Sequence, residues 1–438
     1  MNPSAPDRPV ELLAEAGHRP VRFPLIVVSH LRWGFVFQRP QHLLTRLVSD
    51  FDVYFIEEPV FVDDTPRLHR TGRFGQVEVL TPQTRERTAG FSDEQLAAMK
   101  PLIAQFMAER GISEPLVWLY TPMALPLVAD MEPRAVIYDC MDDLASFKFA
   151  PPQLVAREAE LMGIADIVTT GGPSLFEARK HRHPNIHCLP SAVDVEHFAP
   201  RNLDRAAPEA ALAAELHGTM PHPRLGFFGV IDERLDLDLV ARMADLRPDW
   251  ALVMVGPVVK IDPETLPQRP NIRWVGMQTY EALPHQLSHW DVCLLPFALN
   301  EATRFISPTK TLEYLSGGKP VISTRIHDVV SLYGAVVRFG DDAQDFVRGV
   351  EQILAESPEE RADWHLRAQC MVDSCTWDDT TAQIATLLRD YLTAPTMQIV
   401  LPGDGATARP SAATEATVCA PLAAVATPTD VAMHPLAN

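Results

Sequence analysis

The sequence predicts an α/β protein built from two doubly wound, Rossmann-like domains. Short apolar runs, typical of strands buried on both faces, alternate with helical segments along most of the chain. This alternation occurs twice, and a polar, alanine-rich and proline-bounded stretch at residues 201–223 separates the two series. The 438 residues are enough for two cores of ordinary size. A parallel sheet covered by helices is therefore expected in each half.

The first series of strands begins at Phe23, where the run Phe-Pro-Leu-Ile-Val-Val-Ser is apolar throughout. Helical or loop segments such as Asp93–Arg110 are expected between the strands. The other predicted strands of this half are 52–56, 76–81, 116–120, 135–138 and 164–170.

The loop after the first strand carries four side chains suited to ligand binding, Trp33, Gln38, Arg39 and His42. A loop that leaves the carboxyl end of the first strand lies where doubly wound sheets bind ligands. Its aromatic and basic residues suit stacking on, and hydrogen bonding to, a sugar ring. The alternative is an aromatic plug that packs the loop and leaves Arg39 on the surface.

The second series begins near Leu225 and ends in a helix that starts at Trp377. Its predicted strands are 225–228, 250–255, 271–275, 291–295 and 321–323, and its predicted helices are 235–246, 283–289, 343–356 and 359–374. Asp236-Leu237-Asp238 has the spacing of a metal-binding Asp-x-Asp, but it falls at a helix start and is interpreted as helix N-terminal charge. No metal site is expected.

A short helix in this half has the composition of an anion site. Ser307 is its predicted N-cap, Pro308 fits the first position, and Gly317-Gly318 ends it. The free N–H groups of a helix start, together with the charge of Lys310, suit a phosphate. Glu313, three residues later, lies on nearly the same face and can accept hydrogen bonds from hydroxyl groups. A simple surface pair of Lys310 with Glu313 is the alternative.

Two further turns could contribute to the same site. Gly229 lets the backbone approach a ligand closely, and Arg234 could reach its charged groups. In the first half, Asp139-Cys140-Met141-Asp142-Asp143 follows a strand, where the carboxylates could act in proton transfer or simply cap the next segment.

Several of these segments resemble GT-B glycosyltransferases of the glycogen-synthase-like (group 1) class. Glu313 with Gly317-Gly318-Lys319-Pro320-Val321-Ile322-Ser323 is similar to their donor-site helix, in which the glutamate binds the ribose of a nucleotide-sugar. Trp33 with Gln38-Arg39-Pro40-Gln41-His42 resembles a bacterial surface-polysaccharide subgroup, and 189–198 resembles the family's interdomain signature. Phe305 departs from the pattern, since a second glutamate is usual there.

The resemblance, which covers residues 24–393, implies a GT-B architecture with the domains facing across a cleft. It predicts a flexible N-terminus at 1–22, an acceptor-binding domain at 23–200, a linker at 201–223 and a nucleotide-sugar-binding domain at 224–375. A helix at 376–393 would cross back to the first domain, and 394–438 would form a disordered tail.

The implied function is transfer of a hexosyl group from a nucleotide-sugar, with UDP favoured over GDP, to a glycan or lipid-linked acceptor. The nucleotide-sugar is a co-substrate, and neither a cofactor nor a metal is expected. Catalysis is assigned to Asp142 or Asp143 and to Lys310, while the stereochemical outcome stays open. Donor binding is assigned to Gly229, Arg234, Gly256, Arg304, Ser307, Lys310 and Glu313, and acceptor binding to Trp33, Gln38, Arg39 and His42.

The composition limits which classes of partner and which cellular compartment are expected for the protein. The formal net charge of −19 disfavours nucleic acid as a partner, although local contact with the inner face of the membrane stays open. The six cysteines are scattered and form no C-x-x-C pair, as expected of reduced thiols in the cytoplasm. The sequence shows neither a signal-peptide core nor an apolar run of about 18 residues.

Two other functions fit the same residues. One is a two-lobed nucleotide-sugar epimerase, which would need carboxylates and a histidine near the sugar. The other is a catalytically silent protein that binds nucleotide or glycan, a hypothesis that Phe305 favours. Release of nucleoside diphosphate with and without acceptor separates the three.

Overall fold

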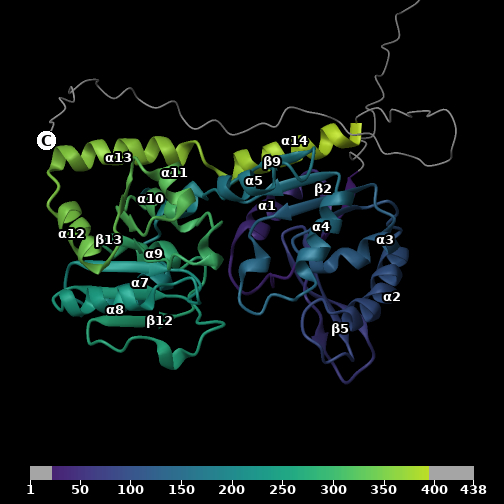
Figure 1. Cartoon of the computed structure of the whole chain (residues 1–438), viewed down its shortest axis with the longest axis horizontal. Helices are drawn as coiled ribbons and strands as arrows, with labels where there is room; N and C mark the ends of the chain where they lie inside the picture. Colours follow the sequence, from purple (N-terminus) through teal and green to yellow (C-terminus); the bar gives the residue numbers. More distant parts are fainter. Residues whose placement is uncertain (1–21, 394–438) are drawn as a thin grey trace, which may run out of the picture.

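The protein consists of two α/β lobes that lie side by side (Figure 1). The computed structural model describes residues 22–393. The predictions for the N-terminus up to residue 21 and for 394–438 fall outside these residues.

The sheet of the first lobe has nine strands in the order β3-β5-β2-β1-β6-β7-β8-β9, with β4 paired to β5. All its pairs are parallel except β4 with β5. The strands are β1 (Phe23–Val28), β2 (Phe51–Ile56), β3 (Val60–Phe61), β4 (Arg67–Phe74), β5 (Val77–Thr84), β6 (Leu116–Leu119), β7 (Ala135–Cys140), β8 (Ile167–Thr170) and β9 (Ile186–Cys188). The antiparallel strand β4 was not predicted, because its charged residues give no apolar pattern.

Helices cover both faces of this sheet. They are α1 (Arg39–Leu47), α2 (Asp93–Arg110), α3 (Val128–Met131), α4 (Leu154–Ile164) and α5 (Pro173–Arg179). One core contains Ile103 of α2 and Leu161 of α4, and the other contains Leu43 of α1. Burial on both faces explains why the parallel strands are apolar throughout. The next helix, α6 (Val195–Phe198), packs against the core of the second lobe through Phe198.

The sheet of the second lobe has six parallel strands in the order β12-β11-β10-β13-β14-β15. They are β10 (Arg224–Phe228), β11 (Ala251–Val255), β12 (Ile272–Gly276), β13 (Val292–Leu295), β14 (Val321–Ser323) and β15 (Val337–Phe339). The strand order reverses between β10 and β13, which is the point where doubly wound sheets bind ligands.

The helices of the second lobe include most of the predicted ones. They are α7 (Pro208–His217), α8 (Leu237–Leu246), α9 (Leu283–Ser288), α10 (Lys310–Ser316), α11 (His327–Tyr333), α12 (Ala343–Leu354) and α13 (Pro358–Asp373), and the last helix of the described chain is α14 (Trp377–Thr393). Asp236 caps α8 by accepting from the Leu239 amide at 2.8 Å, as its place at a helix start predicted. Across residues 22–393, none of the helices has the length and apolar character needed to cross a membrane.

The predicted linker at 201–223 is more structured than a plain connector. It contains α7, and buried His217 of that helix lies 2.9 Å from Gln286 of α9 through its Nε2 atom. Alanine has the highest helix propensity, which explains why this alanine-rich stretch forms α7. The helix packs on the second lobe and is not an extended connection between the two lobes.

The last helix returns to the first lobe, as the resemblance implied. Figure 1 shows α13 over the second lobe and α14 continuing across the first. Trp377 stacks on His42 of α1 with ring centroids 4.8 Å apart, and Asp378 pairs with Arg46 at 2.7 Å. Where the chain crosses, the Val193 amide donates to the Cys375 carbonyl at 3.0 Å, and the Trp377 amide donates to the Val193 carbonyl at 3.2 Å.

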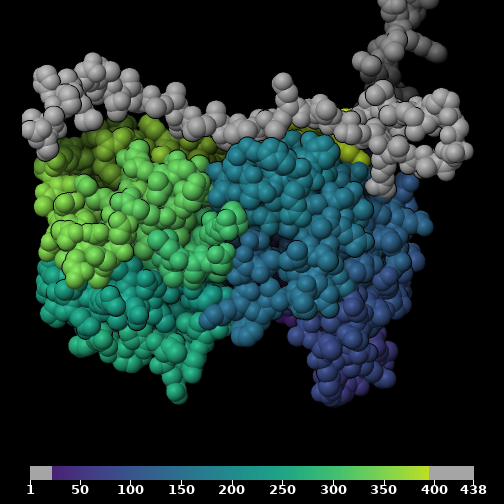
Figure 2. Space-filling view, viewed as in Figure 1, coloured from purple at the N-terminus to yellow at the C-terminus, as the bar shows by residue number. Residues whose placement is uncertain are grey.

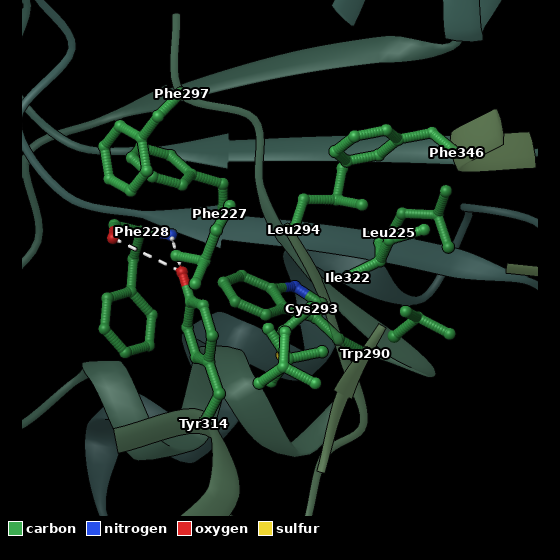
Figure 3. Close-up of a cluster of buried hydrophobic side chains, with 14 of the residues drawn as sticks. Leu225, Phe227, Phe228, Trp290, Cys293, Leu294, Phe297, Tyr314, Ile322 and Phe346 are labelled. Carbon is green, nitrogen blue, oxygen red and sulfur yellow. Dashed lines mark hydrogen bonds between the residues drawn. The ribbon is translucent and has the colours of Figure 1, made fainter. Parts of the chain in front are cut away.

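The core of the second lobe holds α10 against the central strands (Figure 3). The Tyr314 hydroxyl of α10 accepts from the Phe228 amide at 2.9 Å and lies 3.4 Å from the Phe228 carbonyl. Trp290 packs directly on Gly226, where a Cβ atom would lie 1.8 Å from the indole ring. These contacts fix α10 beside the carboxyl end of β10.

Candidate functional site

A cleft of about 460 Å³ lies between the lobes, at the carboxyl ends of both sheets. Figure 2 shows the surface hollowed between the two lobes on the side away from α13 and α14. The loop after β1 and residues Met141 and Asp142 form one wall, and the turns after β10, β11 and β13 form the other. The cleft therefore lies where strand topology places ligands in both domains.

Two glycines, Gly229 and Gly256, line the second-lobe side of the cleft with their backbones. Gly229 has φ of 153° and Gly256 has φ of 143°, values that favour glycine. A Cβ atom on Gly256 would lie 1.7 Å from the Gly229 carbonyl oxygen, so the two turns touch through their backbones. A Cβ atom on Gly229 would lie 3.3 Å from Cε of Lys310, so this lysine lies directly above the turn.

Lys310 and Glu313 of α10 both line the cleft. Glu313 is only 6% exposed, and its Oε2 atom has no hydrogen-bond partner among residues 22–393. Burial raises the pKa of Glu313, and nearby Lys310 opposes this shift. A buried carboxylate oxygen without a partner is costly, so this atom is available to accept from a ligand hydroxyl.

Ser307 lines the cleft but does not cap α10 as predicted. The helix begins at Lys310, and the cap position is Thr309, with no side-chain capping bond. Pro308 stays outside the helix, and its carbonyl accepts from the Thr311 amide at 3.2 Å. The Ser-Pro pattern predicted a helix at the correct place in the chain, but the predicted first residue, Pro308, lies two residues before the observed one, Lys310.

Arg234 lines the cleft and is held by its neighbour Asp232. The guanidinium makes contacts of 2.7–3.1 Å with both carboxylate oxygens of Asp232, which is 4% exposed. The same guanidinium lies 5.4 Å above the ring of Phe147 from the first lobe. Arg234 is therefore fixed in orientation at the meeting point of the two lobes.

The two neighbouring carboxylates of the first lobe have different surroundings. Asp142 lines the cleft, and desolvation raises its pKa to about 6, opposed by the charges of Arg234, Arg39 and Lys310. Asp143 pairs with Arg179 at 2.8 Å and accepts from the Ser146 hydroxyl at 2.6 Å. Of these two neighbours, Asp142 is the one whose carboxylate lines the cleft.

The predicted acceptor loop forms the opposite wall, with Trp33, Gln38 and Arg39 lining the cleft. The Trp33 amide donates to Glu57 Oε1 at 2.6 Å, which fixes the start of the loop. Arg39 is not on the surface, since it is 1% exposed and pairs with fully buried Asp139 at 2.8 Å. Its Nη2 atom has no hydrogen-bond partner among residues 22–393.

Two predicted residues lie away from the cleft. His42 is buried behind the loop against Trp377, and burial holds its pKa well below the usual value. Arg304 is 64% exposed at its side chain and lies 3.7 Å from Glu301. The structure therefore brings neither side chain into the cleft.

Tyr280 is a cleft residue that sequence reasoning missed. It stacks on Phe37 of the first lobe with centroids 4.4 Å apart, and on His197 with centroids 3.9 Å apart. Phe305, where a glutamate is usual, packs against the core of the first lobe. No local pattern indicates Tyr280, whereas Phe305 was noted in the sequence and its packing against the other lobe became known from the structure.

No group of three or more His, Cys, Asp or Glu side chains in the described part of the chain could hold a metal ion.

Comparison with known proteins agrees with this geometry. Residues 222–356 match the family described as glycosyl transferases group 1. TuaH of Bacillus subtilis (strain 168), assigned as a teichuronic acid biosynthesis glycosyltransferase, is 24% identical over 282 residues, which is 60% of this chain and 69% of TuaH.

Solved structures share the architecture at low identity. Sucrose-phosphate synthase from Thermosynechococcus elongatus aligns over 85% of this chain and 100% of its own, with a TM-score of 0.65 and 16% identity. Anabaena Alr3699/HepE, solved in complex with UDP and glucose, aligns over 84% of this chain and 100% of its own, with a TM-score of 0.62 and 13% identity. The chain is therefore similar to group 1 glycosyl transferases over residues 222–356, and it shares the two-lobed GT-B fold of these solved structures.

Proposed function

We propose that the chain transfers a hexosyl group from a UDP-sugar to a glycan or lipid-linked acceptor in the synthesis of a cell-surface polysaccharide. One arrangement carries the proposal. Lys310 and Glu313 lie on one turn of α10 beside the open backbone of Gly229, in the same cleft as Asp142 of the other lobe. A donor and an acceptor bound to opposite walls would meet there.

The second-lobe wall suits a nucleoside diphosphate. The unpartnered Oε2 of Glu313 would accept from the ribose hydroxyls, and Lys310 and Arg234 would bind the diphosphate. Gly229 and Gly256 leave room for its oxygens near the backbone. UDP is favoured because Anabaena Alr3699/HepE was solved with UDP and glucose, and because a trehalose-phosphate synthase of the same architecture is described as UDP-forming.

Asp142 is assigned as the general base. Its carboxylate would take the proton of the acceptor hydroxyl as that oxygen forms a bond to the anomeric carbon and the bond to the diphosphate breaks. Attack from the face opposite the leaving group inverts the anomeric centre. Lys310 and Arg234 stabilise the negative charge that develops on the diphosphate, so no metal is required for this step.

The first-lobe wall suits a sugar acceptor. Trp33 offers an aromatic edge, Gln38 an amide and Arg39 a buried Nη2 atom that has no hydrogen-bond partner among the described residues. Similarity to TuaH, assigned to teichuronic acid biosynthesis, favours a surface polysaccharide as product. Contact with the inner face of the membrane would place the chain beside a lipid-linked acceptor.

The test is release of nucleoside diphosphate from UDP- and GDP-sugars, with and without a glycan acceptor and in the presence of EDTA. We expect UDP release that requires acceptor and persists in EDTA, and its loss in Lys310→Ala. Arg304→Ala, outside the cleft, is the matched control and should retain activity. Interconversion of the sugar without UDP release would support the epimerase, and nucleotide binding without turnover would support the silent protein.

A further inference from the structure

Four large apolar side chains that line the cleft are open to solvent, and the proposed reaction uses none of them. They are between 37% and 47% exposed, and they are named here the apolar lining: Phe35, Phe37, Phe74 and Met277. Exposed apolar side chains that gather in one cavity are typical of a surface that binds an apolar ligand or partner.

Strand β4 brings Phe74 into the cleft. Phe74 is the last residue of this mostly exposed strand and pairs with Val77 of β5. Its ring packs on Trp33 with centroids 5.6 Å apart, and Trp33 packs edge-on against Phe55 of the core at 5.1 Å. A row of three rings therefore leads from the core of the first lobe to the cleft, with Phe74 at its exposed end.

The loop after β1 is held by two buried side chains, Glu57 and Gln41. Glu57 accepts from the Trp33 amide at 2.6 Å. Gln41 donates through Nε2 to the carbonyls of Trp33 and Val36 at 2.8 and 3.0 Å. Phe35 lies between these two carbonyls, so its exposed ring belongs to a fixed loop. A loop that is fixed before binding loses little conformational entropy when a ligand arrives.

Phe37 connects the first-lobe part of the apolar lining to the second lobe. Its ring stacks on Tyr280 with centroids 4.4 Å apart. Tyr280 lies three residues after Met277, in the loop that follows β12. The apolar lining therefore has members on both walls of the cleft that Asp142 also lines.

The chemistry of these side chains selects between the two kinds of acceptor in the proposed function. Phenylalanine has no hydrogen-bonding atom, and methionine offers only a weakly accepting sulfur. The hydroxyls of a free glycan placed against them would lose hydrogen bonds to water without replacement, which is unfavourable. A hydrocarbon chain would lose only its contact with water, which is favourable.

We infer that the apolar lining binds the hydrocarbon part of the acceptor, and that the acceptor is a lipid-linked sugar and not a free glycan. The reacting hydroxyl of the sugar lies at Asp142, and the chain runs over Phe35 and Phe74. The inference rests on the proposed function, because Asp142 as the base decides where the acceptor sugar lies.

Alkyl glycosides test the inference, because the methyl and octyl glycosides of one sugar differ only in the chain. With the acceptor sugar that supports UDP release, we expect kcat/KM to be about 50-fold higher for the octyl glycoside, since each methylene group that leaves water favours binding. The assay is run below the concentration at which the octyl glycoside forms micelles. Equal values for the two glycosides would overturn the inference.

Substitutions of Phe74 test whether the chain lies where the inference places it. Phe74→Ser should lower the octyl-to-methyl ratio below about fivefold, while the affinity for UDP stays within about twofold of the wild type. Phe74→Leu keeps an apolar side chain without the ring, so it should retain a ratio of at least about 20. A ratio lost equally in both variants would indicate stacking of a sugar on the ring and contradict the inference.

Phe61→Ser is the matched control, because Phe61 of β3 is exposed to a similar extent, at 36%, but does not line the cleft. Its octyl-to-methyl ratio should equal that of the wild type. If Phe61→Ser lowers the ratio as much as Phe74→Ser, the chain binds to exposed apolar surface in general and the inference is wrong.

Binding of the chain can also be measured without transfer. Calorimetric titration should show tighter binding of octyl glucoside than of methyl glucoside to the wild type and to Phe61→Ser, and a much smaller difference in Phe74→Ser. If this pattern is found but no acceptor supports UDP release, the apolar lining is confirmed as a chain site and the proposed function fails. If soluble glycans are glycosylated and the chain adds nothing to affinity, the inference is wrong and the proposed function stands.

Discussion

Arg179 and Asp143 form an ion pair of 2.8 Å that gives two adjacent carboxylates different surroundings. Asp143 has its charge balanced inside the first lobe, whereas Asp142 faces the cleft with its pKa raised to about 6. A raised pKa at a cleft position is typical of groups that transfer protons.

Replacing Asp142 by asparagine should lower kcat by a factor of about 10²–10⁴, since the general base is lost. Wild-type kcat should rise with pH through about 6 as the carboxylate loses its proton. Initial rates from pH 4.5 to 8.5 check both statements, and a profile that is flat below pH 7 would contradict the assignment. Asp143→Asn should affect stability more than the pH midpoint.

Asp142→Asn should also raise the melting temperature at neutral pH. The folded-state pKa of about 6 lies above the usual value, so the unfolded chain loses its proton first as pH rises. The contribution of Asp142 to stability is therefore full below pH 4 and is lost as pH rises through 6. Thermal melts at pH 4 and pH 7.5 should show a difference between variant and wild type only at the higher pH.

Glu313→Gln should weaken UDP binding about tenfold, equivalent to about 1.4 kcal/mol, because an amide is a poorer acceptor than a carboxylate. The melting temperature without ligand should stay equal or rise, since burial already disfavours the charged side chain. Calorimetric titration with UDP, together with melts of the free protein, measures both. A variant that binds UDP like the wild type would exclude Glu313 as a ribose ligand.

Asp139→Asn should lower the free energy of unfolding by about 3–5 kcal/mol, because it leaves Arg39 buried without its counter-charge. The pair is 2.8 Å long, and its side chains are 1% and 0% exposed. Arg67→Ala, which breaks an exposed pair with Asp64, is the control and should change stability by less than about 1 kcal/mol. Urea denaturation of the three proteins provides the comparison.

Tyr314→Phe should cost about 1–3 kcal/mol, since it removes the acceptor of the buried Phe228 amide. Because Gly229 follows Phe228 directly, UDP affinity should fall as well. Measured binding that is unchanged alongside a lower melting temperature would show that Tyr314 acts on the fold alone.

Much of the fold could be predicted from the sequence because buried parallel strands are apolar on both faces. β14 at Val321–Ser323 has the predicted bounds, and the segment Asp93–Arg110, expected to be either helix or loop, forms α2. β4 and α7 were missed, since the first is a charged antiparallel strand and the second lies in a stretch that composition favoured as linker.

The cleft was predicted less completely. Lys310 and Glu313 lie in the connection that follows β13, and Arg234 lies in the one that follows β10, so the order of strands was enough to place them at the carboxyl edge. His42 in α1 and Arg304 in the loop after β13 lie close in sequence to cleft residues, and the direction in which each side chain points depends on packing that no short motif encodes. Tyr280 contacts Phe37 of the other lobe, so it could be identified only after both domains had been placed.

The paired chain crossing at Val193 and Cys375–Trp377 limits how the lobes can move. Two neighbouring segments, hydrogen-bonded in parallel, form a hinge with a defined axis, whereas a single strand would leave the lobes free to twist. The cleft could then open by rotation of one lobe relative to the other about a single hinge axis. Substrates would enter and leave by that single degree of freedom.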